Sequence, residues 1–401
     1  MSEQQLYFYT AFLITYNNRA CKTIHNTLQT ILNKNDNLGR YVYFLQKVTN
    51  FWPNPGLSVW ISSHILDRTV TWFEKTVRID VVKPGQIWTD LGIVDPLGIL
   101  NGPVNSVRIE KIFNSAAKPV LITLSSVSMA PQDTSTSNPS TLPPFTRPSS
   151  NPSTTANQVS SYRVIFKRGD DLRQDYAVQT MFFIFNRLWQ LSPLEHKPSI
   201  YQYRILPMGE RIGFVEFVHG CRAAGEISWK KTLSNPEDKL TLFTSMAGSY
   251  LACWVLGIRD RHQDNMMMKD DRIFFHIDFG FIFNDAPGFD APIFSIPGGF
   301  RKHLNQDEWN FFLKICGDAF AVLHQNSGVI MNACTHLMSD LPTLSSSQVR
   351  KYLVRSLMVG IPETSAKHKI RNFIAEGSTS TQKEMKYLMH GIAVKMNERK
   401  V

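Results

Sequence analysis

A pair of short apolar runs constrains the fold of this chain more than any other feature. The runs are Asn265–Met268 and Ile273–Ile277, and residues 269–271 between them are all charged. Two such runs joined by a short polar turn predict a β-hairpin. Antiparallel pairing brings the outer ends of the two strands side by side, so we expect Asn265 and Asp278 to be neighbours.

The polar residues at this hairpin mouth indicate a metal site. An amide oxygen and a carboxylate are hard ligands suited to Mg²⁺, with phosphate oxygens completing the coordination shell. Asp260 lies five residues before Asn265, the D-x4-N spacing of kinase catalytic loops, and Asp278-Phe279-Gly280 is a second motif that binds metal in such sites. Together they predict phosphoryl transfer from ATP, with Mg²⁺ as cofactor, Mn²⁺ as an alternative, and Asn265 and Asp278 as metal ligands.

Phosphoryl transfer also requires a cation on the phosphates. Residues 161–166 read as a strand that ends in Lys167, and Asp175 at the start of the next helix is the carboxylate expected to hold its extended side chain. The small-residue turn at 114–119 offers backbone N–H groups and Ser115 as a cover for phosphates. The turn alone is a weak signal.

The wider pattern predicts an α+β chain. Residues 1–92 have mixed helical periodicity, and β-type runs follow at 106–112, 119–127 and 161–166. The tract 131–160, rich in Ser, Thr and Pro, is expected to be a disordered insertion that lengthens a hairpin loop. An apolar helix to Trp189, strands at 201–206 and 211–218, and a mainly helical remainder complete a two-lobed α+β pattern.

One stretch needs an explicit choice between a core helix and a membrane span. Leu240–Ile258 has no charged residue and is nearly long enough to cross a bilayer, but it contains several Ser, Thr and Gly residues and runs into a polar loop. A buried helix of a globular domain is favoured. The 5 cysteines form no CxxC pair, so neither a zinc site nor a disulfide framework is expected.

Three motifs carry a resemblance to a known family. Gly169–Asp175 (GDDLRQD), Gly257–His262 (GIRDRH) followed by Asn265, and His276–Gly280 (HIDFG) closely resemble motifs of the phosphatidylinositol 3-/4-kinase superfamily, with greater likeness to the 3-kinases. The resemblance covers roughly residues 93–401. It implies a bilobal protein-kinase-like fold, with a β-rich N-lobe (93–219) and a helical C-lobe (220–401), preceded by a mainly helical segment (1–92).

The resemblance also implies roles for individual residues. Asp260 and His262 occupy catalytic positions that activate the hydroxyl and stabilise the transferring phosphate, and Lys167 with Asp175 forms the phosphate-contacting pair. The nucleotide site implied by the resemblance comprises Ser115, Lys167, Ile165, Glu216, Phe217, Val218, Met267 and Ile277, with adenine bound through backbone groups of Glu216 and Val218.

The loop after the DFG motif bears on the substrate. Residues 281–300 are expected to face the lipid headgroup, and they contain Asp285 and Asp290 but no Lys or Arg. A headgroup with additional phosphates would need cations there. The sequence therefore favours phosphatidylinositol or a monophosphorylated phosphoinositide. By resemblance the 3-position is favoured over the 4-position.

The distribution of charge along the chain indicates the kind of membrane surface to which the protein would bind. The net charge is +10, and the last 36 residues carry eight basic and three acidic side chains. Met385, Leu388, Met389, Ile392 and Met396 follow helical spacing, which predicts a basic amphipathic helix that lies on an anionic membrane or packs on the C-lobe. We expect a cytoplasmic protein peripheral to membranes, with a regulatory subunit left open and nucleic acid excluded as a partner.

Two other functions remain open on this reading. A protein kinase related to the phosphoinositide kinases would share the catalytic motifs, and a catalytically inactive scaffold would keep the fold. Every motif position that would bind metal or phosphate has a suitable residue, which favours an active lipid kinase.

Overall fold

The computed structural model describes residues 67–97, 99–100, 103–115, 117–127, 159–209, 211–288, 290, 293–338, 341 and 345–379. The predicted amphipathic helix at the C-terminus and most of the predicted helical segment 1–92 lie outside these residues. So does most of the predicted insertion, apart from Val159 and Ser160. These two residues were predicted to belong to the insertion, which is wrong, because they pair with Val127 and Ser126 as the first residues of a strand.

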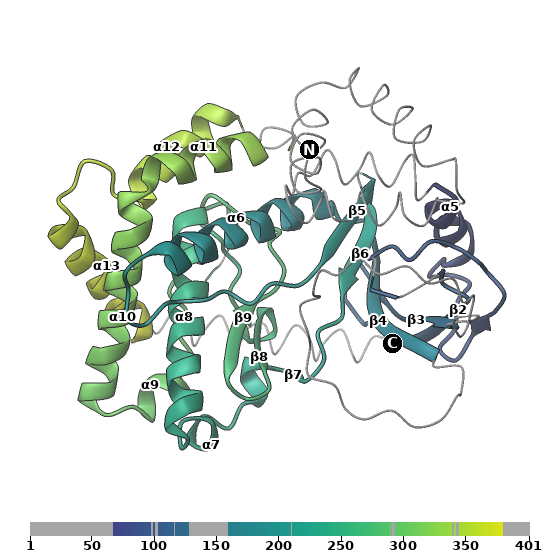
Figure 1. Ribbon diagram of the computed structural model, residues 1–401, viewed down its shortest axis with the longest axis horizontal. Coiled ribbons are helices and arrows are strands. Elements are labelled where there is room, and N and C mark those ends of the chain that lie inside the picture. The colour runs from purple at the N-terminus through teal and green to yellow at the C-terminus, as the bar shows by residue number, and fades with distance from the viewer. Residues whose placement is uncertain are drawn as a thin grey trace, which may run out of the picture.

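A six-stranded antiparallel sheet occupies the N-terminal part of the described chain (Figure 1). Its spatial order is β1-β2-β3-β4-β6-β5. The strands are β1 (Ile87–Trp88), β2 (Ser106–Ile112), β3 (Val120–Val127), β4 (Val159–Arg168), β5 (Ile205–Gly209) and β6 (Ile212–Glu216). The three runs predicted before residue 170 are confirmed, and β3 pairs antiparallel with β4 as the predicted long hairpin requires.

The predicted strand at 201–206 is only partly correct, because β5 begins at Ile205. Before that point backbone N–H groups donate to side chains, although the Arg204 carbonyl still accepts the Glu216 N–H of β6 (2.8 Å). The Ile200 N–H donates to Asn186 Oδ1 (2.7 Å) and the Arg204 N–H donates to Glu216 Oε2 (2.9 Å). The predicted strand 211–218 likewise ends early, at Glu216.

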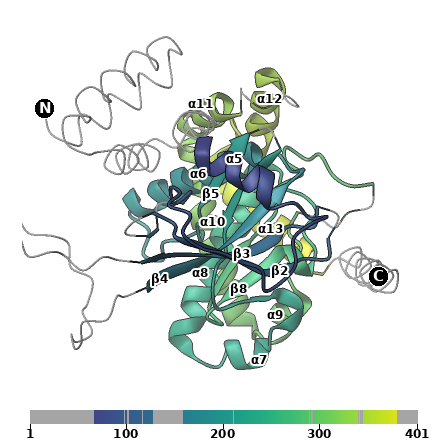
Figure 2. The ribbon, with the colours of Figure 1, turned by 90° about the vertical axis from the view of Figure 1, so that its right-hand side faces the viewer.

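Helix α5 (Asp67–Thr76) covers one face of this sheet (Figures 1 and 2). Its Phe73 ring lies 4.7 Å from the ring of Phe214 and 5.5 Å from that of Phe166, and all three side chains are buried. Because successive strand residues point to opposite faces, Ile165 and Lys167 lie on the other face of the sheet. This face is therefore where the predicted nucleotide-contacting residues of β4 are presented.

The predicted hairpin is confirmed in a second, three-stranded sheet of order β7-β8-β9. Its strands are β7 (Cys221–Ala223), β8 (Met266–Lys269) and β9 (Ile273–His276). Asp270 and Asp271 both have positive φ (50° and 55°), which is what a tight turn between right-twisted strands requires. Met266 lies opposite His276 in this register.

The remaining elements are mainly helical. They are α6 (Leu172–Leu191), η1 (Ala224–Glu226), α7 (Trp229–Thr232), α8 (Pro236–Leu256), η2 (Gln263–Asn265), α9 (Gly298–Lys302), α10 (Gln306–Gln325), α11 (Ser327–Leu337), α12 (Ser346–Ser356) and α13 (Glu363–Ser378). Helix α8 contains most of the stretch weighed as a membrane span, and it is the central buried helix of this part (Figure 1). Among the helices of the described residues, none combines the length and apolarity needed to cross a bilayer.

Two clusters of buried apolar side chains organise the molecule. The smaller cluster lies between α5 and the six-stranded sheet. The larger one joins the helices to the three-stranded sheet and includes α6. Helix α6 is tied into it at its C-terminal end, where Trp189 Nε1 donates to the Ala319 carbonyl of α10 (3.0 Å).

Candidate active site

The end of β4 and the start of α6 present a lysine to a group of carboxylates. Lys167 Nζ lies 3.3 Å from Asp170 Oδ2, an ion pair that the sequence reasoning did not identify. The predicted partner, Asp175, is close enough to raise the pKa of Lys167, and its Oδ1 accepts the Phe279 N–H (3.2 Å). Asp175 therefore connects α6 to the DFG segment, while Asp170 is the carboxylate in direct contact with Lys167.

The charges of this group depend on one another. Burial acts to lower the pKa of Lys167, but the carboxylates of Asp175, Asp278 and Asp170 together raise it above its ordinary value. The pKa of Asp175 is raised to about 6, mainly by burial and with a contribution from the Asp278 carboxylate, while Lys167 acts to lower it. Lys167 is thus a permanent cation held beside acidic groups, as a ligand for phosphates requires.

The catalytic-loop segment begins where α8 ends. Gly257 closes the helix in a left-handed conformation (φ 61°), and three residues later Asp260 also has a positive φ of 63°. The Asp260 carbonyl accepts the His262 N–H (3.1 Å) and Asn265 Nδ2 (3.0 Å). The two predicted catalytic side chains are thereby brought together, with His262 Nε2 at 3.8 Å from Asp260 Oδ2.

The predicted metal ligands meet at the hairpin mouth. The Ile277 N–H donates to the Asn265 carbonyl (3.1 Å), so Asp278 follows directly after the last paired residue. Since Asn265 uses its amide nitrogen on the Asp260 carbonyl, its side-chain oxygen is the atom suited to a cation. The oxygen donors of Asn265 and Asp278 fit Mg²⁺, and the nearby carboxylate of Asp175 adds to the negative charge that such an ion would balance.

Arg261 is a site residue that sequence reasoning missed. It is almost fully buried, and its guanidinium donates to the carbonyls of Arg259 (2.9 Å) and Ile277 (2.8 Å) and to that of Asp278. Asp278 has a positive φ of 62°, a conformation that costs a non-glycine residue about 1–2 kcal/mol. Arg261 thus fixes the backbone that carries a metal ligand. In the sequence, the feature that could have indicated a role for Arg261 is its position between two predicted catalytic residues, Asp260 and His262.

The predicted apolar walls of the nucleotide site come from two sheets. Met266 and Met268 are fully buried in the core, so the alternating Met267 points away from it and is only partly buried. Ile165 and Ile277 are also partly buried. This partial exposure is what the walls of an open adenine pocket require.

The predicted adenine-binding segment directly follows β6. The Glu216 N–H donates to the Arg204 carbonyl (2.8 Å), so the predicted adenine contact at this residue would use the Glu216 carbonyl. The Phe217 N–H donates to the Arg163 carbonyl (3.3 Å), and the Arg163 guanidinium lies over the Phe217 ring at 4.8 Å. Val218 is partly buried against the larger core.

Ser115 belongs to another segment of the six-stranded sheet. It lies in the exposed turn between β2 and β3, where its carbonyl accepts the Lys118 N–H (3.0 Å). Within the part of the chain that the structure describes, no hydrogen bond joins its side chain to the Lys167 group. His276, in contrast, is a core residue: it is buried against Tyr250 and Phe274, and burial lowers its pKa well below the ordinary value.

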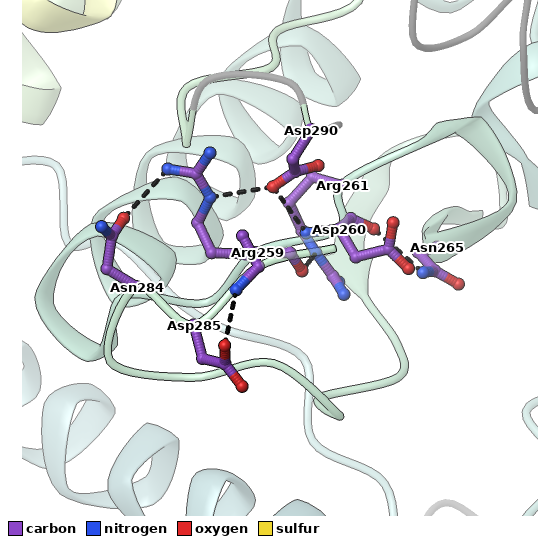
Figure 3. Close-up of polar contacts among 8 residues, drawn as sticks. Arg259, Asp260, Arg261, Asn265, Asn284, Asp285 and Asp290 are labelled. Atoms are coloured by element: carbon purple, nitrogen blue, oxygen red, sulfur yellow. Dashed lines mark hydrogen bonds and ion pairs between the residues drawn. The ribbon is translucent and has the colours of Figure 1, made fainter. Parts of the chain in front are cut away.

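The acidic residues after the DFG motif differ in their surroundings. Asp285 is exposed, whereas the Asp290 side chain is only 3% exposed and its Oδ2 lies 2.8 Å from Arg259 Nε (Figure 3). The expectation that residues 281–300 face the headgroup stays a prediction, and within this stretch the Asp290 carboxylate is turned toward the predicted catalytic loop.

Comparisons with known proteins agree with this geometry. The sequence profile of the family described as "Phosphatidylinositol 3- and 4-kinase" matches residues 161–242 and 231–346. The chain is 28% identical over 262 residues to phosphatidylinositol 3-kinase 1 of Dictyostelium discoideum, covering 57% of this chain and 16% of that protein. It is 29% identical over 213 residues to phosphatidylinositol 3-kinase VPS34 of Arabidopsis thaliana, covering 48% of this chain and 26% of the relative. For the protein of the same name from Saccharomyces cerevisiae the identity is 32% over 202 residues, covering 45% and 22%. The matches thus span between 16% and 26% of the length of these relatives.

Proposed function

We propose that the chain contains a catalytic domain of the phosphatidylinositol 3- and 4-kinase superfamily and is an ATP-dependent phosphoinositide kinase, since it is similar to the profile of that family and to proteins named phosphatidylinositol 3-kinase. It transfers the γ-phosphate of Mg-ATP to an inositol-ring hydroxyl of phosphatidylinositol, with the 3-position preferred, at a membrane surface. One observation carries the proposal: a half-buried lysine at the end of β4, an Asp–His pair and two metal-suited oxygen donors lie around the mouth of one hairpin. In this proposal the kinase lobes are 93–219 and 220–401, preceded by segment 1–92. The two core clusters follow these limits only in part, because α6 belongs to the larger cluster and Phe73 of α5 to the smaller one.

The residues divide the chemistry among them. Asp260 accepts the proton of the attacking hydroxyl as its oxygen bonds to the γ-phosphorus and the bond to the leaving ADP oxygen breaks. Lys167 holds the phosphates, while His262 stabilises the charge on the transferring group. Asn265 and Asp278 would hold Mg²⁺ or Mn²⁺, which neutralises phosphate charge when bound.

The names of the relatives favour the 3-position, since all three are phosphatidylinositol 3-kinases. A phosphatidylinositol 4-kinase and a related Ser/Thr protein kinase are the alternatives. The absence of Lys and Arg from residues 281–300 supports phosphatidylinositol or a monophosphate as substrate. A cytoplasmic location on a membrane surface and a regulatory subunit belong to the same proposal.

The test uses the full chain with labelled ATP and Mg²⁺. It is incubated separately with phosphatidylinositol vesicles, with vesicles of a bisphosphorylated phosphoinositide, and with a protein substrate. We expect transfer to phosphatidylinositol. This transfer should be lost in Asp278→Ala and kept in Asp307→Ala, a control at an exposed position. Transfer to protein only would contradict the proposal, as would no transfer at all. Chromatography of the lipid product decides the position, and a 4-phosphate would overturn the preference for the 3-position.

A further inference from the structure

The loop after the DFG motif reaches back to the catalytic loop through one buried carboxylate. Oδ2 of Asp290 accepts two hydrogen bonds, from Arg259 Nε (2.8 Å) and from the backbone N–H of Asp260 (3.1 Å) (Figure 3). The residues it joins are thirty and thirty-one positions earlier in the chain. A buried acceptor shared by a cation and a main-chain donor is a strong, directional contact.

Asp260 needs such a contact because its backbone is in an unfavourable conformation. With φ at 63°, it is held in the left-handed region, which a non-glycine residue occupies only when its surroundings impose it. Its carbonyl is held by Asn265 Nδ2 and by the His262 N–H. Its N–H is held by Asp290. Both backbone polar groups of the predicted catalytic base are therefore fixed, one by a predicted metal ligand and the other by the substrate-facing loop.

Arg259 adds a second tether between the same two loops. Its backbone N–H donates to the Phe281 carbonyl (3.0 Å), and its Nη1 donates to Asn284 Oδ1 (3.0 Å). In Figure 3 its guanidinium lies between Asn284 and Asp290. Because the Arg259 side chain donates to both Asn284 and Asp290, it keeps the Asp290 carboxylate at the Asp260 N–H and away from solvent.

We propose that Asp290 is a positioning residue that sets the orientation of the Asp260 side chain and so couples the conformation of the headgroup-facing loop to proton removal from the lipid. This inference rests on the proposed kinase function. A carboxylate is required because one oxygen serves a guanidinium and a main-chain N–H together, and an amide oxygen is the weaker acceptor for both. The nucleotide-contacting residues lie on other elements, so ATP binding is expected to be independent of Asp290.

The test compares the full-length wild type with Asp290→Asn, Asp290→Glu and the control Asp318→Asn. Asp318 also pairs with basic side chains, Lys314 at 2.8 Å and Lys367 at 2.9 Å, but it lies between α10 and α13 and outside the site. Hydrogen exchange is followed in peptides that contain the Asp260 amide, and steady-state kinetics are measured with phosphatidylinositol vesicles.

In Asp290→Asn, exchange at Asp260 is expected to speed up and kcat to fall on the order of 100-fold, with the KM for ATP within about twofold of wild type. Asp290→Glu, which keeps the charge, is expected to recover part of kcat. Asp318→Asn leaves both readouts unchanged. Unchanged exchange at Asp260 in Asp290→Asn would overturn the inference, as would a loss of kcat matched by a rise in the KM for ATP. If the wild type transfers no phosphate, the proposed kinase function fails, and the exchange comparison still decides whether Asp290 positions Asp260.

Discussion

Replacing Gly257 with alanine probes how tightly the catalytic loop is held at the end of α8. An added Cβ would lie 2.5 Å from the backbone nitrogen of Asn284 and 2.7 Å from both Cζ and the hydroxyl oxygen of Tyr352. The left-handed conformation, with φ at 61°, costs alanine about 1 kcal/mol more than glycine. Overpacking against backbone adds about 1–3 kcal/mol. The Gly257→Ala variant should therefore lose about 2–4 kcal/mol of unfolding free energy.

Gly92 supplies the matched control, because it has a similar φ of 57° and nothing within 4 Å of its would-be Cβ. Gly92→Ala should show the conformational cost alone, about 1 kcal/mol. Urea unfolding of the two variants and the wild type measures both values. Equal losses in the two variants would refute the reasoning, since they would mean that Asn284 and Tyr352 do not press on the end of α8.

Three further outcomes are expected. Lys167→Met should lower kcat with phosphatidylinositol vesicles on the order of 100-fold or more, because the cation on the transferring phosphate is lost; activity near that of wild type would remove Lys167 from the mechanism. Asp278→Asn should raise the Mg²⁺ concentration for half-maximal activity on the order of 10-fold, measured by metal titration, and an unchanged midpoint would exclude Asp278 as a ligand. Glu308→Gln should cost about 1 kcal/mol at neutral pH, because Lys239 at 2.5 Å and the Asn305 N–H lower the pKa of Glu308 in the folded state. That contribution is fully present above the ordinary pKa of 4.5 and is lost as the pH falls through the lower folded value, so melting temperatures of variant and wild type should converge in acid. A difference that persists at low pH would show that the carboxylate charge is not responsible.

The parts of the site that the sequence predicts are those set by local pairing. The two short apolar runs and the charged turn between them determine which residues of β8 and β9 lie opposite each other, and that register places Asn265 next to Asp278. Strand β2 has the predicted limits for the same reason. The sequence also places Lys167 correctly at the end of a strand, and the structure shows that the preceding Phe166 is buried in the smaller core cluster.

The unpredicted parts depend on contacts between segments distant in the chain. The role of Arg261 requires the carbonyls of Ile277 and Asp278 to converge on it, and the role of Asp290 requires a loop to fold back over thirty residues. Neither leaves a periodic pattern in the sequence. Asp170 was missed because the turn between β4 and α6, with Gly169 at φ 101°, determines which of several nearby carboxylates reaches Lys167.

The contacts that hold helix α6 limit how the proposed activity could be regulated. In protein kinases, control is often exerted by swinging the equivalent helix, so that its acidic residue leaves the lysine. Here the helix is anchored at both ends: Gln174 Nε2 donates to the Phe279 carbonyl (2.7 Å) at one end, and Trp189 binds α10 at the other. Outward rotation would break both bonds and separate the Phe182 and Phe279 rings, now 5.3 Å apart. These contacts oppose outward rotation of α6, so a control of the proposed activity that leaves the core intact is expected to act on the loops around Asp260.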